Sequence, residues 1–185
     1  MVYTITKFWF YPVLSLFIGK IKGKQNIPTR GNFIIISNHF HLIDPLLIIY
    51  PMLKKLNKKI HFLAKPSWWF LGETFCRKYA GCIPLFDSKQ AYNEIKEYIK
   101  KGKIIGIFPQ GDYKKGNNTF KTGVIRLALE TNTPILPIGI KSSYTLFGSA
   151  LNMGKLIHLE KNKKTIEQKA EDLMSHVYQL KNEID

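Results

Sequence analysis

The sequence predicts an α/β fold, in which a single domain (residues 25–185) has a mostly parallel sheet flanked by helices and follows a short helical segment (residues 1–24). The length of 185 residues lies within the range of one domain, and 45% apolar and 13% aromatic residues are enough to build a core. Along the chain, short apolar runs typical of buried strands alternate with longer helical patterns. Such alternation favours a parallel sheet covered by helices.

The N-terminal segment contains an apolar, aromatic-rich run from Phe8 to Ile18. A helix needs roughly 20 apolar residues to cross a bilayer, and this run is shorter and contains Pro12. Lys7 and Lys20 flank it. This pattern suits a helix lying in a membrane interface, and it equally suits an ordinary helix packed on the domain. The first interpretation predicts a peripheral or monotopic membrane protein with residues 1–24 at the interface.

The first strand is predicted at residues 33–37, where an apolar run follows a turn. A helix over residues 44–56 comes next, because Pro45 suits the first helical position. Pro51 is expected to break or kink this helix. Residues 60–64 are the second predicted strand.

The middle of the chain repeats the alternation. Residues 66–80 form an aromatic-rich predicted helix, and residues 81–86 a short strand. An amphipathic helix over residues 88–101 ends at Gly102, since glycine readily terminates helices. Residues 104–108 are the next predicted strand.

The remaining elements are a helix over residues 122–132, a strand over 134–140 and a polar terminal helix over 162–182. In parallel sheets, ligands gather at the carboxyl ends of the strands. Two loops are expected at such ends, one containing His39 and one beginning at Pro109. Functional side chains are therefore expected in these two loops.

The first of these loops contains His39 and, five residues later, Asp44. A histidine whose second ring nitrogen bonds a carboxylate is fixed in one tautomer and becomes a good general base. Two alternatives remain open on residue types alone. Asp44 before a proline is also a plausible helix cap, and His39, His41 and Asp44 are conceivable metal ligands.

The segment from Asn38 to Asp44 resembles the N-H-x-x-x-x-D motif of the phospholipid and glycerol acyltransferase family, the lysophosphatidic acid acyltransferases. In that family the histidine is the general base and the aspartate orients it. Further segments over roughly residues 25–140 are similar to family motifs in the same order: Phe62–Lys65, Gly81–Phe86, Phe108–Gly111, Phe120–Gly123 and Pro134–Pro137.

The resemblance implies a membrane-associated O-acyltransferase. It would transfer a fatty acyl group from acyl-CoA or acyl carrier protein to a lysophospholipid or a related lipid hydroxyl, with His39 and Asp44 catalytic and with no cofactor or metal. Either the backbone around Gly111 or Lys65 is expected to meet the oxyanion. The expected substrate-binding residues are Lys65, Pro109, Gln110, Gly111, Lys114 and Lys121.

Two positions depart from the family pattern. Asp87 stands where the family usually has an arginine for the acceptor's phosphate, and Gln110 replaces a glutamate. An anion beside a phosphate weakens binding. One expectation is therefore an acceptor without a phosphate, such as a glycolipid or another lipid alcohol. Alternatively, nearby lysines take over the phosphate: Lys114, Lys115 or Lys121.

The charge balance predicts anionic partners. The chain has 28 Lys and Arg against 13 Asp and Glu, a net charge of +15. A catalytically inactive protein that binds membranes or nucleic acid is the rival interpretation. Nucleic acid is not the expected partner, because the aromatic residues cluster at 8–17 and 62–79 rather than interleave with lysines. The expected partners are a membrane lipid surface on the cytoplasmic face, the acyl thioester donor (possibly acyl carrier protein) and the lipid acceptor.

Overall fold

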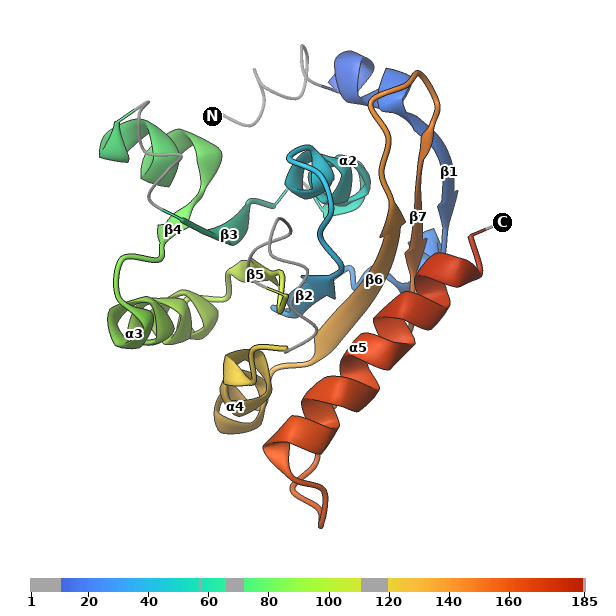
Figure 1. Cartoon of the computed structure of the whole chain (residues 1–185). Helices are drawn as coiled ribbons and strands as arrows, with labels where there is room; N and C mark the ends of the chain where they lie inside the picture. The colour runs from blue at the N-terminus through green and yellow to red at the C-terminus, as the bar shows by residue number, and fades with distance from the viewer. Residues whose placement is uncertain (1–10, 57, 66–71, 111–119, 185) are drawn as a thin grey trace.

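The computed structural model describes residues 11–56, 58–65, 72–110 and 120–184. In this part of the chain, strands form one sheet in the order β1-β7-β6-β2-β5-β3-β4 (Figure 1). All neighbouring strands are parallel except β6 and β7. The mostly parallel sheet is therefore confirmed. The strands are β1 (Ile18–Lys22), β2 (Ile34–Ser37), β3 (Ile60–Ala64), β4 (Ile83–Pro84), β5 (Ile104–Ile107), β6 (Ile135–Lys141) and β7 (Ser149–Met153).

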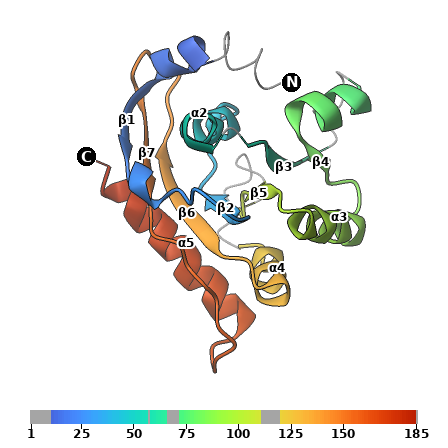
Figure 2. The ribbon, with the colours of Figure 1, turned by 180° about the vertical axis from the view of Figure 1, so that it is seen from behind.

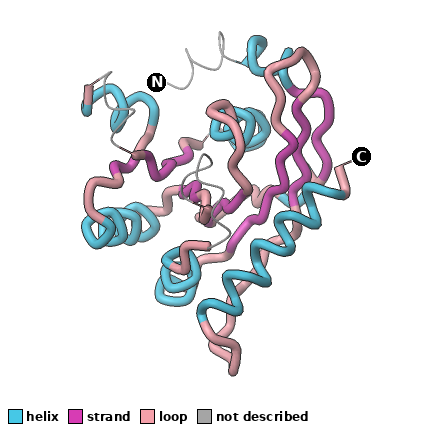
Figure 3. The backbone as a smooth tube through the Cα atoms, in the orientation of Figure 1, coloured by secondary structure: helices cyan, strands magenta, loops and turns pink. Residues whose placement is uncertain are grey.

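Helices cover both faces of this sheet, with α2 on one side and α3, α4 and α5 on the other (Figures 1 and 2). Figure 3 shows the strands side by side between these layers. The Asp87 side chain caps α3 by accepting a 2.7 Å hydrogen bond from the Gln90 amide, and Thr165 with Gln168 forms a capping box at α5. The helices are α2 (Asp44–Leu56), α3 (Ser88–Lys100), α4 (Gly123–Thr131) and α5 (Ile166–Asn182), with η1 (Lys24–Asn26) and the π-helical η3 (Phe75–Ala80).

The side chains of the central strand β2 contribute to the apolar core on both faces of the sheet. Ile35 packs on the α2 side, whereas Ile34 and Ile36 pack against the helices of the opposite face. All three side chains are essentially inaccessible to solvent. Burying an isoleucine contributes roughly 1.5–3 kcal/mol, so this strand holds the two layers together and fixes the position of the loop that follows it.

Most predicted elements are present, and the differences have physical causes. α2 continues through Pro51, so a break at this proline is wrong, and the alternative of a kink stays a prediction. The strand predicted at 81–86 shortens to β4, and α5 begins at Ile166 rather than 162. β7 was not predicted. Of the helix predicted at 66–80, residues 66–71 lie outside the described residues.

Residues 18–22 are a further correction. They belong to the segment predicted to be helical, but they form β1, which pairs in parallel with β7 more than a hundred residues later. Gly19 permits the close approach, since a Cβ atom there would lie 2.2 Å from the carbonyl oxygen of Phe147. The strand thus depends on a distant partner that local sequence does not reveal.

The helical residues 11–17 pack on α2 through one side only. The rings of Tyr11 and Tyr50 stack with centroids 4.3 Å apart, and Leu14 is buried. Val13 and Leu16 remain exposed. No helix among the described residues has the length and apolar character needed to span a bilayer. Most of the predicted interfacial segment, residues 1–10, lies outside the described residues.

Candidate active site

The candidate site lies where three parallel strands end. β5 pairs in parallel with both β2 and β3, so the carboxyl ends of all three meet at one edge of the sheet. His39 follows β2, the segment Phe108–Gln110 follows β5, and Lys65 follows β3. The topology therefore gathers the predicted loops at one edge, as expected for ligand sites in parallel sheets.

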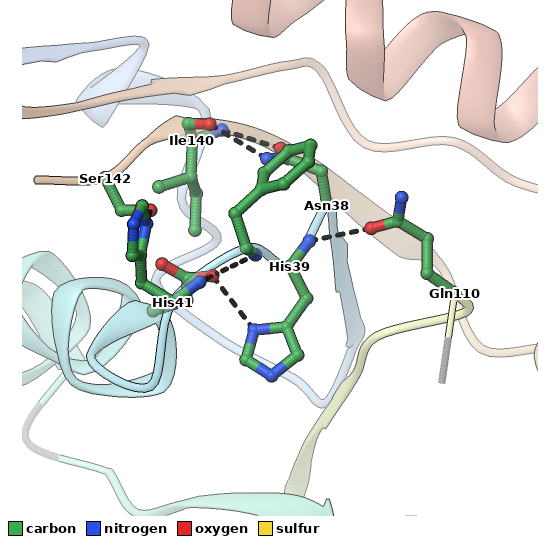
Figure 4. A network of polar contacts seen from close by, with 8 residues as sticks. Asn38, His39, His41, Gln110, Ile140 and Ser142 are labelled. Carbon is green, nitrogen blue, oxygen red and sulfur yellow. Dashed lines mark hydrogen bonds and ion pairs between the residues drawn. The ribbon is translucent and has the colours of Figure 1, made fainter. Parts of the chain in front are cut away.

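His39 and Asp44 are directly paired. The Nδ1 atom of His39 lies 2.9 Å from Oδ2 of Asp44 (Figure 4). The same oxygen accepts hydrogen bonds from the backbone amides of Phe40 (2.7 Å) and His41 (2.9 Å). Asp44 is the first residue of α2 and is fully buried. The loop thus folds back over the start of the helix, and one carboxylate serves both as its anchor and as the partner of the imidazole.

The carboxylate of Asp44 is held in its ionised form. Burial alone would raise its pKa, but hydrogen bonds from the His39 ring and the amides of His41 and Phe40, with a contribution from Ser142, lower the pKa below its ordinary value. An ionised acceptor requires a proton on Nδ1 of His39. With the proton on Nδ1, Nε2 is the basic atom of the ring, and in Figure 4 it lies on the side of the ring away from the hydrogen bond.

An aromatic stack fixes the plane of the imidazole. The rings of His39 and Phe108 lie 4.2 Å apart and are inclined by 18°. Phe62 stacks in turn on Phe108 at 5.7 Å. Gly106 leaves room for this arrangement, because a Cβ atom there would lie 2.2 Å from the Phe62 ring. The orientation of His39 is therefore set by packing as well as by Asp44.

Asn38 anchors the loop to the neighbouring strand. Its side-chain amide donates to the Ile140 carbonyl and its side-chain oxygen accepts from the Ile140 amide, both at 2.8 Å (Figure 4). Asn38 is fully buried. In the sequence, Asn38 was recognisable only as part of the motif. A polar amide directly after a buried strand was the available signal, but its partner lies 102 residues away.

Gln110 connects the two loops of the site. Its Oε1 accepts a 2.8 Å hydrogen bond from the His39 amide, and its Nε2 donates to the hydroxyl of Tyr178 on α5. Burial raises the pKa of Tyr178, and the bond to Gln110 partly offsets this rise. Gln110 therefore positions the backbone of His39. No local signal in the sequence indicated Tyr178, and the predicted contact of Gln110 with substrate stays a prediction.

The other predicted site residues that the structure describes are Lys65, Pro109 and Lys121. Pro109 is buried, and its carbonyl accepts a 2.9 Å hydrogen bond from the Lys121 amide. Lys121 and Lys65 are both exposed. Gly111 and Lys114 lie outside the described residues. The structure thus brings His39, Asp44 and Gln110 together and joins Pro109 to Lys121, on either side of residues 111–119.

The ring of His41, the other histidine of this loop, is directed at Ser142. Its Nδ1 lies 2.7 Å from the hydroxyl of Ser142 at the end of β6, and its ring meets Tyr144 edge-on at 5.0 Å. Within the described ranges, no three His, Cys, Asp or Glu side chains converge as ligands for a metal ion. Among the described residues, the pairing of His39 with Asp44 is an arrangement suited to proton transfer at Nε2, since a carboxylate stabilises an imidazolium.

Comparisons with known proteins agree with this chemistry. The family model described as "Acyltransferase" matches residues 19–141. A 1-acyl-sn-glycerol-3-phosphate acyltransferase of Borreliella burgdorferi is 31% identical over 147 residues, which cover 72% of this chain and 57% of that protein. A Bacillus subtilis protein of the same name is 26% identical, with 94% of each chain covered. This chain therefore spans little more than half of the first relative and nearly all of the second.

A solved structure shares the fold. The crystal structure of the 1-acyl-sn-glycerophosphate (LPA) acyltransferase PlsC from Thermotoga maritima matches with a TM-score of 0.74 and 21% sequence identity. The match covers 99% of this chain and 76% of that chain. At this level of identity, the similarity establishes a common architecture.

Proposed function

Because this chain belongs to the acyltransferase family, we propose that it transfers a fatty acyl group from a thioester to the hydroxyl of 1-acyl-sn-glycerol-3-phosphate, with His39 as the general base. The observation that carries this proposal is the 2.9 Å contact between Nδ1 of His39 and the buried carboxylate of Asp44. It leaves Nε2 as the basic atom of the ring. A base so held activates a hydroxyl without a nucleophilic side chain in the protein.

The proposed reaction is a single acyl transfer. Nε2 of His39 takes the proton of the acceptor hydroxyl as its oxygen attacks the thioester carbonyl carbon. The C–S bond of the tetrahedral intermediate then breaks, and the departing thiolate takes the proton back from the imidazolium, which gives an ester and a free thiol. Asp44 stabilises the imidazolium in between. Backbone amides near Gly111, or Lys65, remain the expected donors to the oxyanion.

The acceptor is proposed from the names of the relatives and from charge. A phosphate group suits a chain with a net charge of +15. Asp87, which stands where the resemblance expects an arginine, caps α3 through Gln90 and is exposed. This capping role explains the carboxylate without requiring a new substrate. It still places a negative charge at that position, and this favours a lipid alcohol without a phosphate as the second candidate acceptor.

The donor is proposed to be acyl-CoA or acyl carrier protein, and the reaction is proposed to take place at a membrane surface on the cytoplasmic face. Long acyl chains partition into lipid, so an enzyme that joins two acyl compounds gains from binding where they collect. Exposed apolar side chains at Val13 and Leu16 support such binding. The high content of lysine and arginine supports attraction to anionic lipids.

Thiol release from a long-chain acyl-CoA in detergent micelles tests the proposal, and acyl carrier protein serves as the second donor. We expect release that depends on 1-acyl-sn-glycerol-3-phosphate and falls by roughly a thousandfold or more in His39→Ala. The matched control is His158→Ala, since His158 is exposed and lies outside the site. Release that is unchanged in His39→Ala removes the proposed base. Preference for monoacylglycerol over the phosphorylated acceptor favours the second candidate.

A further inference from the structure

The loop that joins β6 to β7, residues 142–148, presents three large apolar side chains to solvent. Tyr144, Leu146 and Phe147 are 58%, 64% and 61% exposed. Single apolar residues on a surface are ordinary, but a contiguous exposed group marks a surface that binds something. This loop had no role in the sequence prediction, and the proposed chemistry does not use it.

The hydroxyls of Ser143 and of Ser149, the first residue of β7, bond to the backbone of the same loop. Ser149 donates to the carbonyl of Ser143 (2.9 Å) and accepts from the Ser143 amide (3.0 Å). The hydroxyl of Ser143 accepts from the Thr145 amide (3.1 Å), and the Thr145 carbonyl accepts from Gly148 (3.2 Å). The hydroxyls thus satisfy the backbone while the apolar side chains face outward. A loop that only connects two strands in water would favour the opposite arrangement.

The backbone conformation of Phe147 is unfavourable for a bulky side chain, which indicates that its exposed ring has a function. Its φ of 54° lies in the left-handed region, where glycine and asparagine are favoured and a bulky residue is unusual. The conformation is held by a 2.6 Å hydrogen bond from the Phe147 amide to the carbonyl of Leu16. The Phe147 carbonyl also lies so close to Gly19 that no side chain fits there. The loop is therefore docked on the N-terminal helical residues.

Contacts connect this loop with the helical residues 11–17, through Phe147 and Leu16, and with residues 38–43, which we call the catalytic loop, through Tyr144 and His41. Figures 1 and 2 both show the β6–β7 loop beside the helical residues 11–17. We call six exposed apolar side chains of these three segments the apolar rim. They are all at least 41% exposed: Val13, Leu16, Phe40, Tyr144, Leu146 and Phe147.

The charges around the apolar rim identify its partner. The three segments that form it, residues 11–20, 38–43 and 140–148, contain no Asp or Glu. They contain Lys20 and Lys141, and the Nζ atom of Lys181 lies 4.3 Å from the centre of the Phe40 ring. Apolar and aromatic side chains bordered by lysines suit the interface of an anionic leaflet.

We propose that the apolar rim inserts into an anionic phospholipid leaflet, with Leu146 and Phe147 at its tip. The proposal rests on the proposed function, because it assumes that the acyl substrates reside in the membrane. It adds a second, loop-based contact to the N-terminal segment. It also places the catalytic loop, through Phe40 and the contact of His41 with Tyr144, directly at the leaflet from which the lipid acceptor comes.

The test is co-sedimentation of the full chain with vesicles of phosphatidylglycerol and phosphatidylcholine. The variant is Leu146→Ser with Phe147→Asn, since asparagine tolerates the positive φ of position 147. We expect its vesicle partition coefficient to fall at least about tenfold, because two large apolar groups no longer enter the lipid. The matched control is Phe86→Asn, which removes a ring that is 62% exposed beside β4, at the opposite edge of the sheet from β1.

The outcomes separate the alternatives. Partitioning of the double variant at the wild-type level overturns the proposal, and circular dichroism melts verify that the variant is folded. Equal binding of the wild type to pure phosphatidylcholine overturns the anionic preference. Loss of a concentration-dependent dimer in the double variant, with unchanged vesicle binding, assigns the rim to self-association instead. Vesicle binding requires no turnover, so His39→Ala is expected to bind like the wild type even if the proposed reaction fails.

Discussion

The side-chain oxygen of Gln110 accepts a 2.8 Å hydrogen bond from the backbone amide of His39. This bond braces the loop that follows β2 against the segment that follows β5, and the side-chain amide of Gln110 extends the brace to Tyr178. We expect Gln110→Ala to lower kcat roughly tenfold to a hundredfold with little change in KM, because a small displacement of His39 is costly. Gln110→Glu should retain most activity, since a carboxylate accepts from both His39 and Tyr178. Steady-state kinetics measure this split, and a rise in KM alone would assign Gln110 to substrate binding.

Removing the charge of Asp44 tests the His-Asp pair without changing its shape. Asp44→Asn should reduce kcat by roughly 10³–10⁴-fold, because an amide neither fixes the required tautomer nor stabilises an imidazolium. Asp172→Asn is the control, since Asp172 pairs with Lys164 on the surface and both side chains are 58% exposed. Equal losses in the two variants would contradict the catalytic role of Asp44.

The hydrogen bonds that anchor Asn38 to Ile140 should contribute to the free energy of unfolding. Asn38→Ala leaves both the amide and the carbonyl of Ile140 without their side-chain partners in a buried site. We expect the free energy of unfolding to fall by roughly 2–4 kcal/mol, the cost of two buried polar groups left unpaired. Asn93→Ala on the exposed face of α3 should change it by no more than about 0.5 kcal/mol. Urea denaturation provides both values, and similar values would show that the anchor contributes little.

Gly106 is predicted to tolerate no side chain. A Cβ atom there would lie 2.2 Å from the ring of Phe62, and any shift of that ring would pass through Phe108 to His39. Gly106→Ala should destabilise the protein by roughly 1–3 kcal/mol and also lower kcat. Gly123→Ala is the matched control, because its Cβ atom would meet nothing within 4 Å. A fully active Gly106→Ala enzyme would show that the stack does not orient His39.

His61 should make the stability of the protein depend on pH. Its side chain is buried, and burial, with the charges of Lys59 and Lys103, lowers its pKa from 6.5 to about 4. A pKa lowered in the folded state means that the unfolded chain binds the proton more tightly. The free energy of unfolding is therefore unaffected by the protonation of His61 above about pH 6.5, and it decreases as the pH falls from 6.5 toward 4. His61→Phe should lessen the loss of unfolding free energy between pH 7 and pH 5, whereas His158→Gln at an exposed position should not.

Local patterns predicted the parts of this molecule that have local causes. Asp44 could be paired with His39 from sequence because both lie in one short loop, and α3 could be predicted because residues 88–101 have an amphipathic period of their own. β1 could not be recognised, since its partner β7 is a distant segment. The bonds of Asn38 to Ile140 and of Gln110 to Tyr178 join residues 102 and 68 positions apart. Such contacts depend on the packed sheet rather than on any run of residues.

The bond between Gln110 and Tyr178 also sets an order in time for the newly made chain. His39, Asp44 and Gln110 leave the ribosome first, and Tyr178 follows 68 residues after Gln110. The proposed base and its carboxylate thus exist in the nascent chain before α5 has been synthesised. The brace on His39 is complete only after α5 has packed on β6. The full set of bonds around His39 therefore forms only after this late helix has been made, which couples the final geometry of the proposed site to completion of the fold.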